Sequence, residues 1–312
     1  MLTVRQMRYF RELAHTLHFG HAARALNISQ PALSGQIAQM EAFFGTALFE
    51  RRPAGVTLTA DGELVAGRIE SILADLHDLE SLASQGEETL SGRLRVGLIA
   101  TVAPYLLPSL LAGLGKAHPH LVCEVRESVT DRLLADLKRG EIDCAVVALP
   151  LQEEGLATLP LFDDPFFLAA PIDRAADLPN PVPASIVGEE RILLLEEGHC
   201  LRTQAVDICR LSDGRERAVF GATSLATLLR MVAGGLGATL IPSMAVRDET
   251  RGGGLAILPF AEPVPYRRLV LAFRPTTARR ADFEAFARAT RTACEEAIAG
   301  ADPAIRSPIT AR

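Results

Sequence analysis

Apolar side chains recur at helical spacing through the first part of the chain, and they predict three helices there. The first is expected over residues 2–17, and its apolar face would consist of Met7, Phe10, Leu13, Ala14 and Leu17. A second, shorter helix is expected at about 20–26. The third would start after Ser29, because serine is a favoured N-cap and Pro31 fits the first helical turn.

The third helix is predicted to have two distinct faces. Its apolar face would consist of Leu33, Ile37, Met40 and Phe44. The opposite face would present Gln30, Ser34, Gly35 and Ala38, whose short or amide side chains allow a helix to enter a major groove. A helix, a short turn and a capped helix form the helix-turn-helix plan, in which the second helix reads DNA. The alternative is a helical hairpin that only packs.

A hairpin wing is predicted at 51–58, where Arg51 and Arg52 would meet phosphates. A long helical pattern follows over 59–85. Its apolar positions, spaced alternately by four and three residues, are Val65, Ile69, Ile72, Leu76, Leu79 and Ala83. Such a seam favours a partner helix and so predicts a dimer with two DNA-reading heads. The alternative is a surface helix packed on its own domain.

From residue 91 onward, short apolar strands alternate with helices, which predicts a mostly parallel, doubly wound sheet. Strands are expected at 94–99, 122–128, 144–148, 166–170, 192–196, 218–222, 238–241, 255–260 and 269–273, and helices at 103–116, 130–139, 224–234 and 277–299. The strands at 166–170 and 269–273 would be the two crossings between lobes.

We therefore predict an α/β chain with three parts and a tail. These are an N-terminal winged helix-turn-helix (1–58), a linker and dimerisation helix (59–90), a two-lobed regulatory α/β domain like that of periplasmic binding proteins (91–300), and a tail (301–312). Lobe I would cover about 91–163 and 268–300, and lobe II about 164–267.

Composition and charge refine this picture. The 48% hydrophobic content of the 312 residues supports sizeable cores, and no apolar run is long enough to span a bilayer, so we expect a cytoplasmic protein without a membrane partner. The net charge is −6, yet residues 1–58 hold six arginines and three acidic residues, a net of +3. Residues 59–90 hold one arginine and eight acidic residues, a net of −7. The basic head is consistent with phosphate contact.

The five cysteines show no zinc-like spacing, and we expect neither a metal nor a cofactor. Cys200 follows Gly198 and His199, where a strand would end and a helix begin. A helix N-terminus lowers the pKa of a thiol, and a charged His199 and Arg202 would lower it further.

Cys200 and Cys209 could form a redox switch. If 200–209 were one helix, their Cα atoms would lie roughly 13 Å apart, whereas a disulfide needs about 4.4–6.8 Å. A disulfide would therefore have to remodel the segment, as a switch requires. The alternative is that both thiols are buried and inert.

Three polar groups are expected at the carboxyl ends of strands, where ligands bind in such sheets. Thr101 and Thr130 each follow a strand, as does the run Gly198, His199 and Cys200. All could converge on one cleft. Each threonine could instead be a helix N-cap.

The run Ser-Gln-Pro-Ala-Leu-Ser at 29–34 and the run Leu-Phe-Glu-Arg at 48–51 resemble the N-terminal domain of LysR-type transcriptional regulators. The resemblance extends over nearly the whole chain. It implies that Gln30, Pro31, Ser34 and Gly35 lie at base edges and that Arg51 and Arg52 lie at the DNA backbone. It also favours a linker helix that dimerises.

Within that family the chain resembles the peroxide-sensing OxyR group, through Glu-Gly-His-Cys-Leu-Arg at 197–202, a second cysteine at 209, Ala-Thr-Ser-Leu at 222–225 and the run 97–108. This resemblance implies roles for six residues. Cys200 would be the peroxidatic thiol and Cys209 the resolving one. The side chains expected to hold the peroxide or stabilise the thiolate are Thr101, Thr130, His199 and Arg267. Sulfenic acid at Cys200 would condense with Cys209.

The resemblance also implies partners: double-stranded promoter DNA, hydrogen peroxide, a homodimer or homotetramer, a thiol reductant and RNA polymerase. The chain would be an activator of oxidative-stress genes and not an enzyme. Residues 210–219 depart from the group, since they carry Arg210, Arg215 and Arg217 and lack its aromatic and acidic residues. Two other functions stay open: a LysR-type regulator that binds a small organic ligand in the interlobe cleft, and a cysteine enzyme such as a thiol peroxidase.

Overall fold

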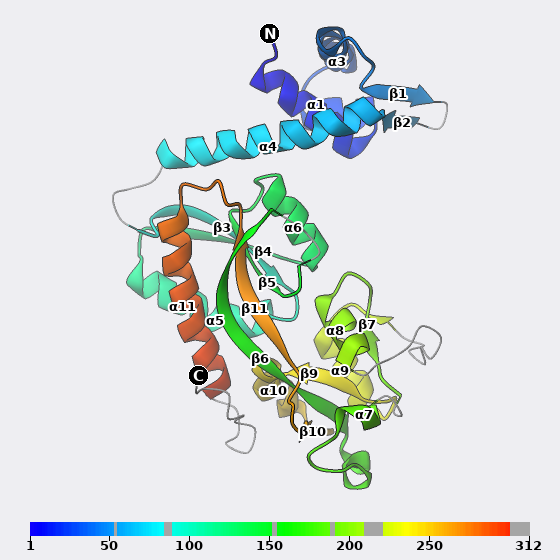
Figure 1. Cartoon of the computed structure of the whole chain (residues 1–312), viewed down its shortest axis with the longest axis vertical. Coiled ribbons are helices and arrows are strands. Elements are labelled where there is room, and N and C mark those ends of the chain that lie inside the picture. Colours follow the sequence, from blue (N-terminus) through cyan, green and yellow to red (C-terminus); the bar gives the residue numbers. More distant parts are fainter. Residues whose placement is uncertain (53–54, 84–88, 152–154, 188–190, 209–220, 300–312) are drawn as a thin grey trace. The chain divides into compact units, whose positions relative to one another are not determined.

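A computed structural model of the chain describes residues 1–52, 55–83, 89–151, 155–187, 191–208 and 221–299. The described residues form two compact units, an N-terminal one that includes residues 1–83 and a second one that includes most residues from 89 onward (Figure 1). Within these ranges, no helix combines the length and the apolar content needed to cross a bilayer. The predicted tail and Cys209 lie outside the described residues.

The N-terminal unit is the predicted winged helix-turn-helix followed by a long helix. Its elements are α1 (Val4–Thr16), α2 (Phe19–Ala25), α3 (Gln30–Phe44), β1 (Phe49–Arg52), β2 (Gly55–Leu58) and α4 (Ala60–Ala83). The Ser29 hydroxyl accepts a hydrogen bond from the backbone N–H of Ala32, so Ser29 caps α3 as predicted. The core of the unit is built from buried side chains of α1, α2 and α3, chief among them Phe10, Leu13, Leu33, Ile37 and Met40.

Two apolar side chains of this unit do not lie where the helical spacing predicts. Leu17 is 41% exposed, because it ends α1 in a left-handed conformation and leaves the helical face. Phe44 is 39% exposed, because it is the last residue of α3 and lies beyond the core, where its ring contacts Phe43. The predicted hairpin is present, with β1 and β2 paired antiparallel from Phe49 and Leu58 to Arg52 and Gly55.

Helix α4 divides its apolar residues between two faces. Ile69 and Leu73 are buried against the core of the N-terminal unit, and Val65 packs at its border. Ile72 and Leu79 are 44% and 64% exposed. The predicted seam is therefore only partly right, since one stripe of it packs on the same unit. The predicted dimer stays a prediction.

The second unit is built on a mixed sheet. Its strands are β3 (Gly92–Ile99), β4 (Leu121–Ser128), β5 (Cys144–Ala148), β6 (Ala157–Pro171), β9 (Thr239–Pro242), β10 (Leu255–Pro259) and β11 (Tyr266–Phe273). They follow the order β10-β6-β11-β5-β3-β4, and β9 also pairs with β6. Strand β3 pairs parallel with β4 and β5, but the other pairs are antiparallel. The expectation of a mostly parallel sheet was wrong, because β11 inserts between β5 and β6 and runs opposite to both.

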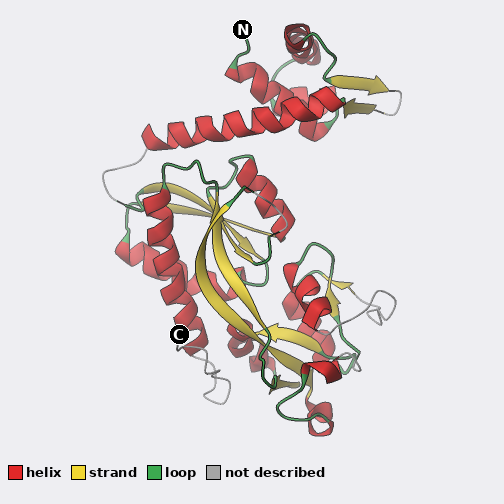
Figure 2. Cartoon of the chain, viewed as in Figure 1, coloured by secondary structure: helices red, strands yellow, loops and turns green. Residues whose placement is uncertain are grey.

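Helices cover this sheet, and a small parallel pair of strands lies beside it (Figure 2). These elements are α5 (Ala103–Ala117), α6 (Thr130–Lys138), α7 (Ala184–Val187), β7 (Leu194–Leu195), α8 (Cys200–Ile208), β8 (Gly221–Ala222), α9 (Leu225–Ala233), α10 (Ser243–Glu249) and α11 (Arg280–Ala299), with short 3-10 turns at Ile172–Asp177 and Thr250–Gly252. Helix α11 packs against α5 and β6. The 15-residue β6 pairs with β11 along its first part and with β9 and β10 along its second, so one strand runs through the whole unit.

Candidate functional site

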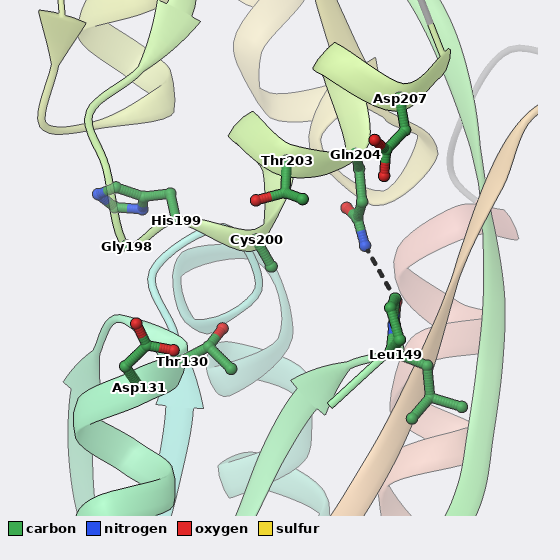
Figure 3. Close-up of a pocket in the computed structure, with 10 residues that line it drawn as sticks. Thr130, Asp131, Leu149, Gly198, His199, Cys200, Thr203, Gln204 and Asp207 are labelled. Carbon is green, nitrogen blue, oxygen red and sulfur yellow. Dashed lines mark hydrogen bonds between the residues drawn. The ribbon is translucent and has the colours of Figure 1, made fainter. Parts of the chain in front are cut away.

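Cys200 is the first residue of α8, and it lines a cavity of about 220 Å³. The cavity forms where the carboxyl ends of three strands meet, as ligand sites in α/β sheets do. It is lined by Thr130, Asp131, Leu149, Pro150, Gly198, His199, Cys200, Thr203, Gln204 and Asp207 (Figure 3). Gly198 has a φ of +88°, a conformation that glycine adopts readily, and it turns the chain from β7 into α8. Thr130, His199 and Cys200 are thus brought together as predicted, although their roles are not tested by their position.

The thiol of Cys200 is not activated in the way the sequence suggests. Burial raises its pKa above the ordinary value, while the positive charge of Arg267, the Thr130 hydroxyl and the backbone N–H groups of Leu201 and Cys200 oppose that rise. The helix N-terminus therefore acts in the expected direction, but burial outweighs it. The expected lowering of the thiol pKa was wrong.

His199 does not supply the positive charge that would lower the pKa of the Cys200 thiol further. Burial lowers the pKa of its imidazole, and the carboxylate of Glu196 only partly offsets this effect. The ring is therefore neutral at pH 7. Figure 3 shows it directed away from the Cys200 side chain. Arg202 donates from Nη1 to the backbone oxygen of Leu195 (3.2 Å), which ties α8 to the preceding strand.

Two buried polar atoms of the cavity wall lack a hydrogen-bond partner among the described residues. One is the hydroxyl oxygen of Thr130, and the other is Oε1 of Gln204, whose Nε2 donates to the backbone oxygen of Leu149 (3.4 Å). Unpaired polar atoms in a cavity favour a small ligand that can both donate and accept hydrogen bonds. Sequence reasoning missed Gln204, although its position four residues after Cys200 places both on one helical face.

Arg267 and Thr101 lie outside the residues that line the cavity and are bound to each other. Nη1 of Arg267 donates to Oγ1 of Thr101 (2.8 Å), and Nη2 donates to its backbone oxygen (3.2 Å). Nε of Arg267 donates to Asp164 (2.9 Å), and the side chains of this ion pair are fully buried. Arg267 lies inside β11, whereas the sequence placed it just before that strand.

Asp164 is a site residue that sequence reasoning missed. Its carboxylate accepts from Arg267 and from the backbone N–H of Met244 (3.2 Å). The signal was present, because an acidic residue two positions before the apolar run 166–170 requires a partner if it is buried.

The N-terminal unit gathers most of the predicted DNA-contacting residues on and beside α3. Gln30 and Pro31 are its first two residues, and both are exposed. Arg51 donates from Nη2 to Oγ of Ser34 (3.0 Å), and its guanidinium carbon lies 4.5 Å from the centre of the Phe19 ring. A Cβ added at Gly35 would meet no atom within 4 Å.

This arrangement leaves an open surface on α3, and Arg51 of the wing lies beside it. Arg52 belongs to β1, but its side chain lies outside the described residues.

Family comparisons cover both units. Residues 4–63 match the bacterial regulatory helix-turn-helix proteins of the lysR family, and residues 87–295 match the LysR substrate binding domain. A probable hydrogen peroxide-inducible genes activator of Streptomyces viridosporus is 42% identical over 293 residues, which cover 93% of this chain and 94% of the relative. The transcriptional dual regulator OxyR of Escherichia coli is 40% identical over 290 residues, with 93% and 95% covered.

Solved structures agree with these relatives. A cysteine-to-serine mutant of OxyR from Corynebacterium glutamicum, bound to hydrogen peroxide, matches with a TM-score of 0.65 and 37% identity over 95% of this chain and 96% of that one. A full-length OxyR mutant from Pseudomonas aeruginosa matches with a TM-score of 0.73 and 33% identity, covering 93% and 95%. The chain therefore belongs to the LysR family of bacterial transcription regulators and, within it, to the OxyR group.

Proposed function

We propose that this regulator senses hydrogen peroxide through reversible oxidation of Cys200 and controls oxidative-stress genes. Peroxide enters the cavity beside Cys200, and the sulfur attacks one oxygen. The O–O bond breaks, the thiol becomes sulfenic acid, and the second oxygen leaves as water with the thiol proton. The thiol of Cys209 then displaces that hydroxyl as a second water, and a disulfide forms. The Thr130 hydroxyl and Gln204 provide hydrogen bonds for the peroxide, and Arg267 favours the thiolate.

The observation that carries this proposal is the position of Cys200 at the start of α8, in a cavity with an unpaired hydroxyl. The position of Cys200 at the start of α8 also explains why disulfide formation would require a change in structure. Helix α8 is continuous from Cys200 to Ile208, so eight steps of about 1.5 Å separate their Cα atoms by roughly 12 Å. Because one peptide unit adds only about 3.8 Å, Cys209 cannot come within the disulfide range of about 4.4–6.8 Å while α8 stays helical.

The DNA-binding part of the proposal concerns α3 and the wing. Gln30, Pro31, Ser34 and Gly35 would read bases, and Arg51 and Arg52 would contact phosphates. Loss of one phosphate contact in Arg51→Ala should weaken binding to specific and unrelated DNA alike and reduce the salt slope by about one.

We place the protein in the cytoplasm, as a homodimer or homotetramer with the domain boundaries predicted from the sequence. RNA polymerase would be a partner, and a thiol reductant would restore the reduced state.

The test is thiol mapping by mass spectrometry on the reduced full chain after near-stoichiometric hydrogen peroxide. Cys200→Ser should abolish the disulfide, and the matched control Cys123→Ser should retain it, because Cys123 lies on β4 outside the cavity. A rapid disulfide between Cys200 and Cys209 is the expected result. Slow oxidation of all thiols alike would overturn the proposal and return attention to an organic ligand in the cleft.

A further inference from the structure

We infer that the carboxylates of Asp131 and Asp207 make the entrance of the Cys200 cavity selective for uncharged oxidants. The inference rests on the proposed function and adds a substrate class to it. Both residues line the cavity, and both are exposed. Asp131 comes from the first turn of α6 and Asp207 from the last turn of α8, so they reach the cavity from two different elements (Figure 3).

The charged side chains that line the described part of the cavity wall are negative. Among the described residues that line it, two are carboxylates and none is lysine or arginine. His199 also lines it, but burial lowers the pKa of its imidazole, so it adds no positive charge at pH 7. Arg267 is the positive group that acts on the sulfur, yet it is fully buried and paired with Asp164. An anion that approaches Cys200 therefore meets two negative charges and no unpaired positive one on the described wall.

The two carboxylates act mainly on the approach of a charged oxidant and not on the pKa of the Cys200 thiol. The leading influences on the pKa of Cys200 are burial and Arg267. Exposed charges interact weakly in water, but a dianion feels both carboxylates, and screening sets in only over about 8 Å at physiological salt. A neutral peroxide feels neither. Selection between oxidants thus needs no change in the reactivity of the thiol.

A pair of probes with the same chemistry but different charge isolates this effect. Hydrogen peroxide is neutral, whereas peroxymonophosphate is a dianion at neutral pH. In both, the sulfur attacks the terminal peroxo oxygen and is oxidised by two electrons to sulfenic acid. The O–O bond breaks in each case, and its electron pair leaves with hydroxide or with phosphate. The product at Cys200 is identical, so the two rates can be compared directly.

The experiment uses the reduced full chain with Cys209→Ser, so that oxidation stops at sulfenic acid, which dimedone traps for mass spectrometry. The pocket variant is Asp131→Asn with Asp207→Asn. The matched control is Asp173→Asn with Asp177→Asn, which removes the same charge from exposed residues that do not line the cavity. The readout is the rate with peroxymonophosphate divided by the rate with hydrogen peroxide.

We expect this ratio to rise roughly three- to tenfold in the pocket variant and less than about twofold in the control, with the difference shrinking at high salt. A normal reaction with hydrogen peroxide but an unchanged ratio, or an equal rise in both variants, overturns this inference alone. Failure of Cys200 to react with hydrogen peroxide overturns the proposed function and the inference with it. Circular dichroism of each variant, including the single substitutions, shows whether a changed ratio comes from the lost charge or from misfolding.

Discussion

The buried ion pair between Arg267 and Asp164 gives a stability prediction with a definite pH signature. In Asp164→Asn the amide keeps an acceptor for the backbone N–H of Met244, but it leaves the buried Arg267 guanidinium without its countercharge. Guanidinium cannot lose its proton in a protein. Breaking a buried pair in this way destabilises a protein by about 3–5 kcal/mol. For a unit of this size the unfolding temperature should fall by roughly 6–20 °C, to the same extent at all pH values near neutrality.

Arg267→Met should behave differently, because the carboxyl of Asp164 can take up a proton. Burial raises the pKa of Asp164, and Arg267 is the main influence that opposes the rise. Without Arg267 the folded-state pKa lies further above the unfolded value of about 3.9. A group of this kind stabilises the fold below its unfolded pKa, and the stabilisation is lost as pH rises through the folded pKa. The variant should therefore lose less stability at about pH 5 than at about pH 8.

The assay is differential scanning calorimetry of the reduced full chain, which resolves the transitions of separate units. Each variant is compared with the unmodified protein at about pH 5, 6.5 and 8, so that the contributions of other titrating groups cancel from the difference in stability. The double variant Asp164→Asn with Arg267→Met serves as the control, and it should recover most of the lost stability because it buries no charge. Equal losses for Arg267→Met at both ends of the pH range, or additive losses in the double variant, would refute the reasoning.

Three further predictions concern the Cys200 thiol and helix α4 of the N-terminal unit. Since burial raises the pKa of Cys200, its oxidation rate should climb about tenfold per pH unit between pH 6 and 8 in stopped-flow measurements, and a flat profile would contradict this. Thr130→Val should slow that oxidation roughly ten- to hundredfold, since it removes a hydroxyl that favours the charged form of the thiol and that is free to hydrogen-bond the reacting peroxide; an unaltered rate would exclude Thr130 from the reaction. In α4, Gly62→Ala should destabilise the N-terminal unit by about 1–3 kcal/mol, because its Cβ would overlap the backbone oxygen of Leu48. Gly67→Ala, which meets nothing, should instead stabilise it by up to about 1 kcal/mol, and chemical denaturation distinguishes the two.

Local signals in the sequence were enough to predict most elements. The cap at Ser29 fixed the start of α3, and the strand at Cys144–Ala148 was predicted with its observed bounds. Sheet order was not predictable, because it depends on β11 returning from far along the chain to pair with both β5 and β6. The first half of β6 was missed since residues 157–165 alternate apolar, acidic and proline positions, and their pairing with β11 overrides these weak local preferences.

Only part of the membership of the candidate site was predictable, because Gln204 was missed and Thr101 and Arg267 do not line the cavity, and the electrostatics of the site were not predictable. Spacing placed Thr130, His199 and Cys200 after strands, and they do line one cavity. The pKa of a thiol, however, depends on how deeply it is buried, and that depth is set by tertiary packing. The sequence could show that a helix begins at Cys200. It could not show that burial would outweigh the helix N-terminus.

The helix that holds Cys200 also sets the energy balance of the proposed switch. Leu201 and Ala205 are buried against the second unit, and burying one leucine is worth about 1.5–3 kcal/mol. Unwinding α8 loses some of this burial. Closing a loop of about ten residues with a disulfide costs about a further 2.7 kcal/mol of chain entropy, so both amounts oppose the oxidised conformation. In the proposed switch, the reduction of peroxide and the formation of the S–S bond supply the free energy that overcomes them. Once a thiol reductant breaks the disulfide, both amounts favour the return of α8, and reduction can therefore restore the original conformation.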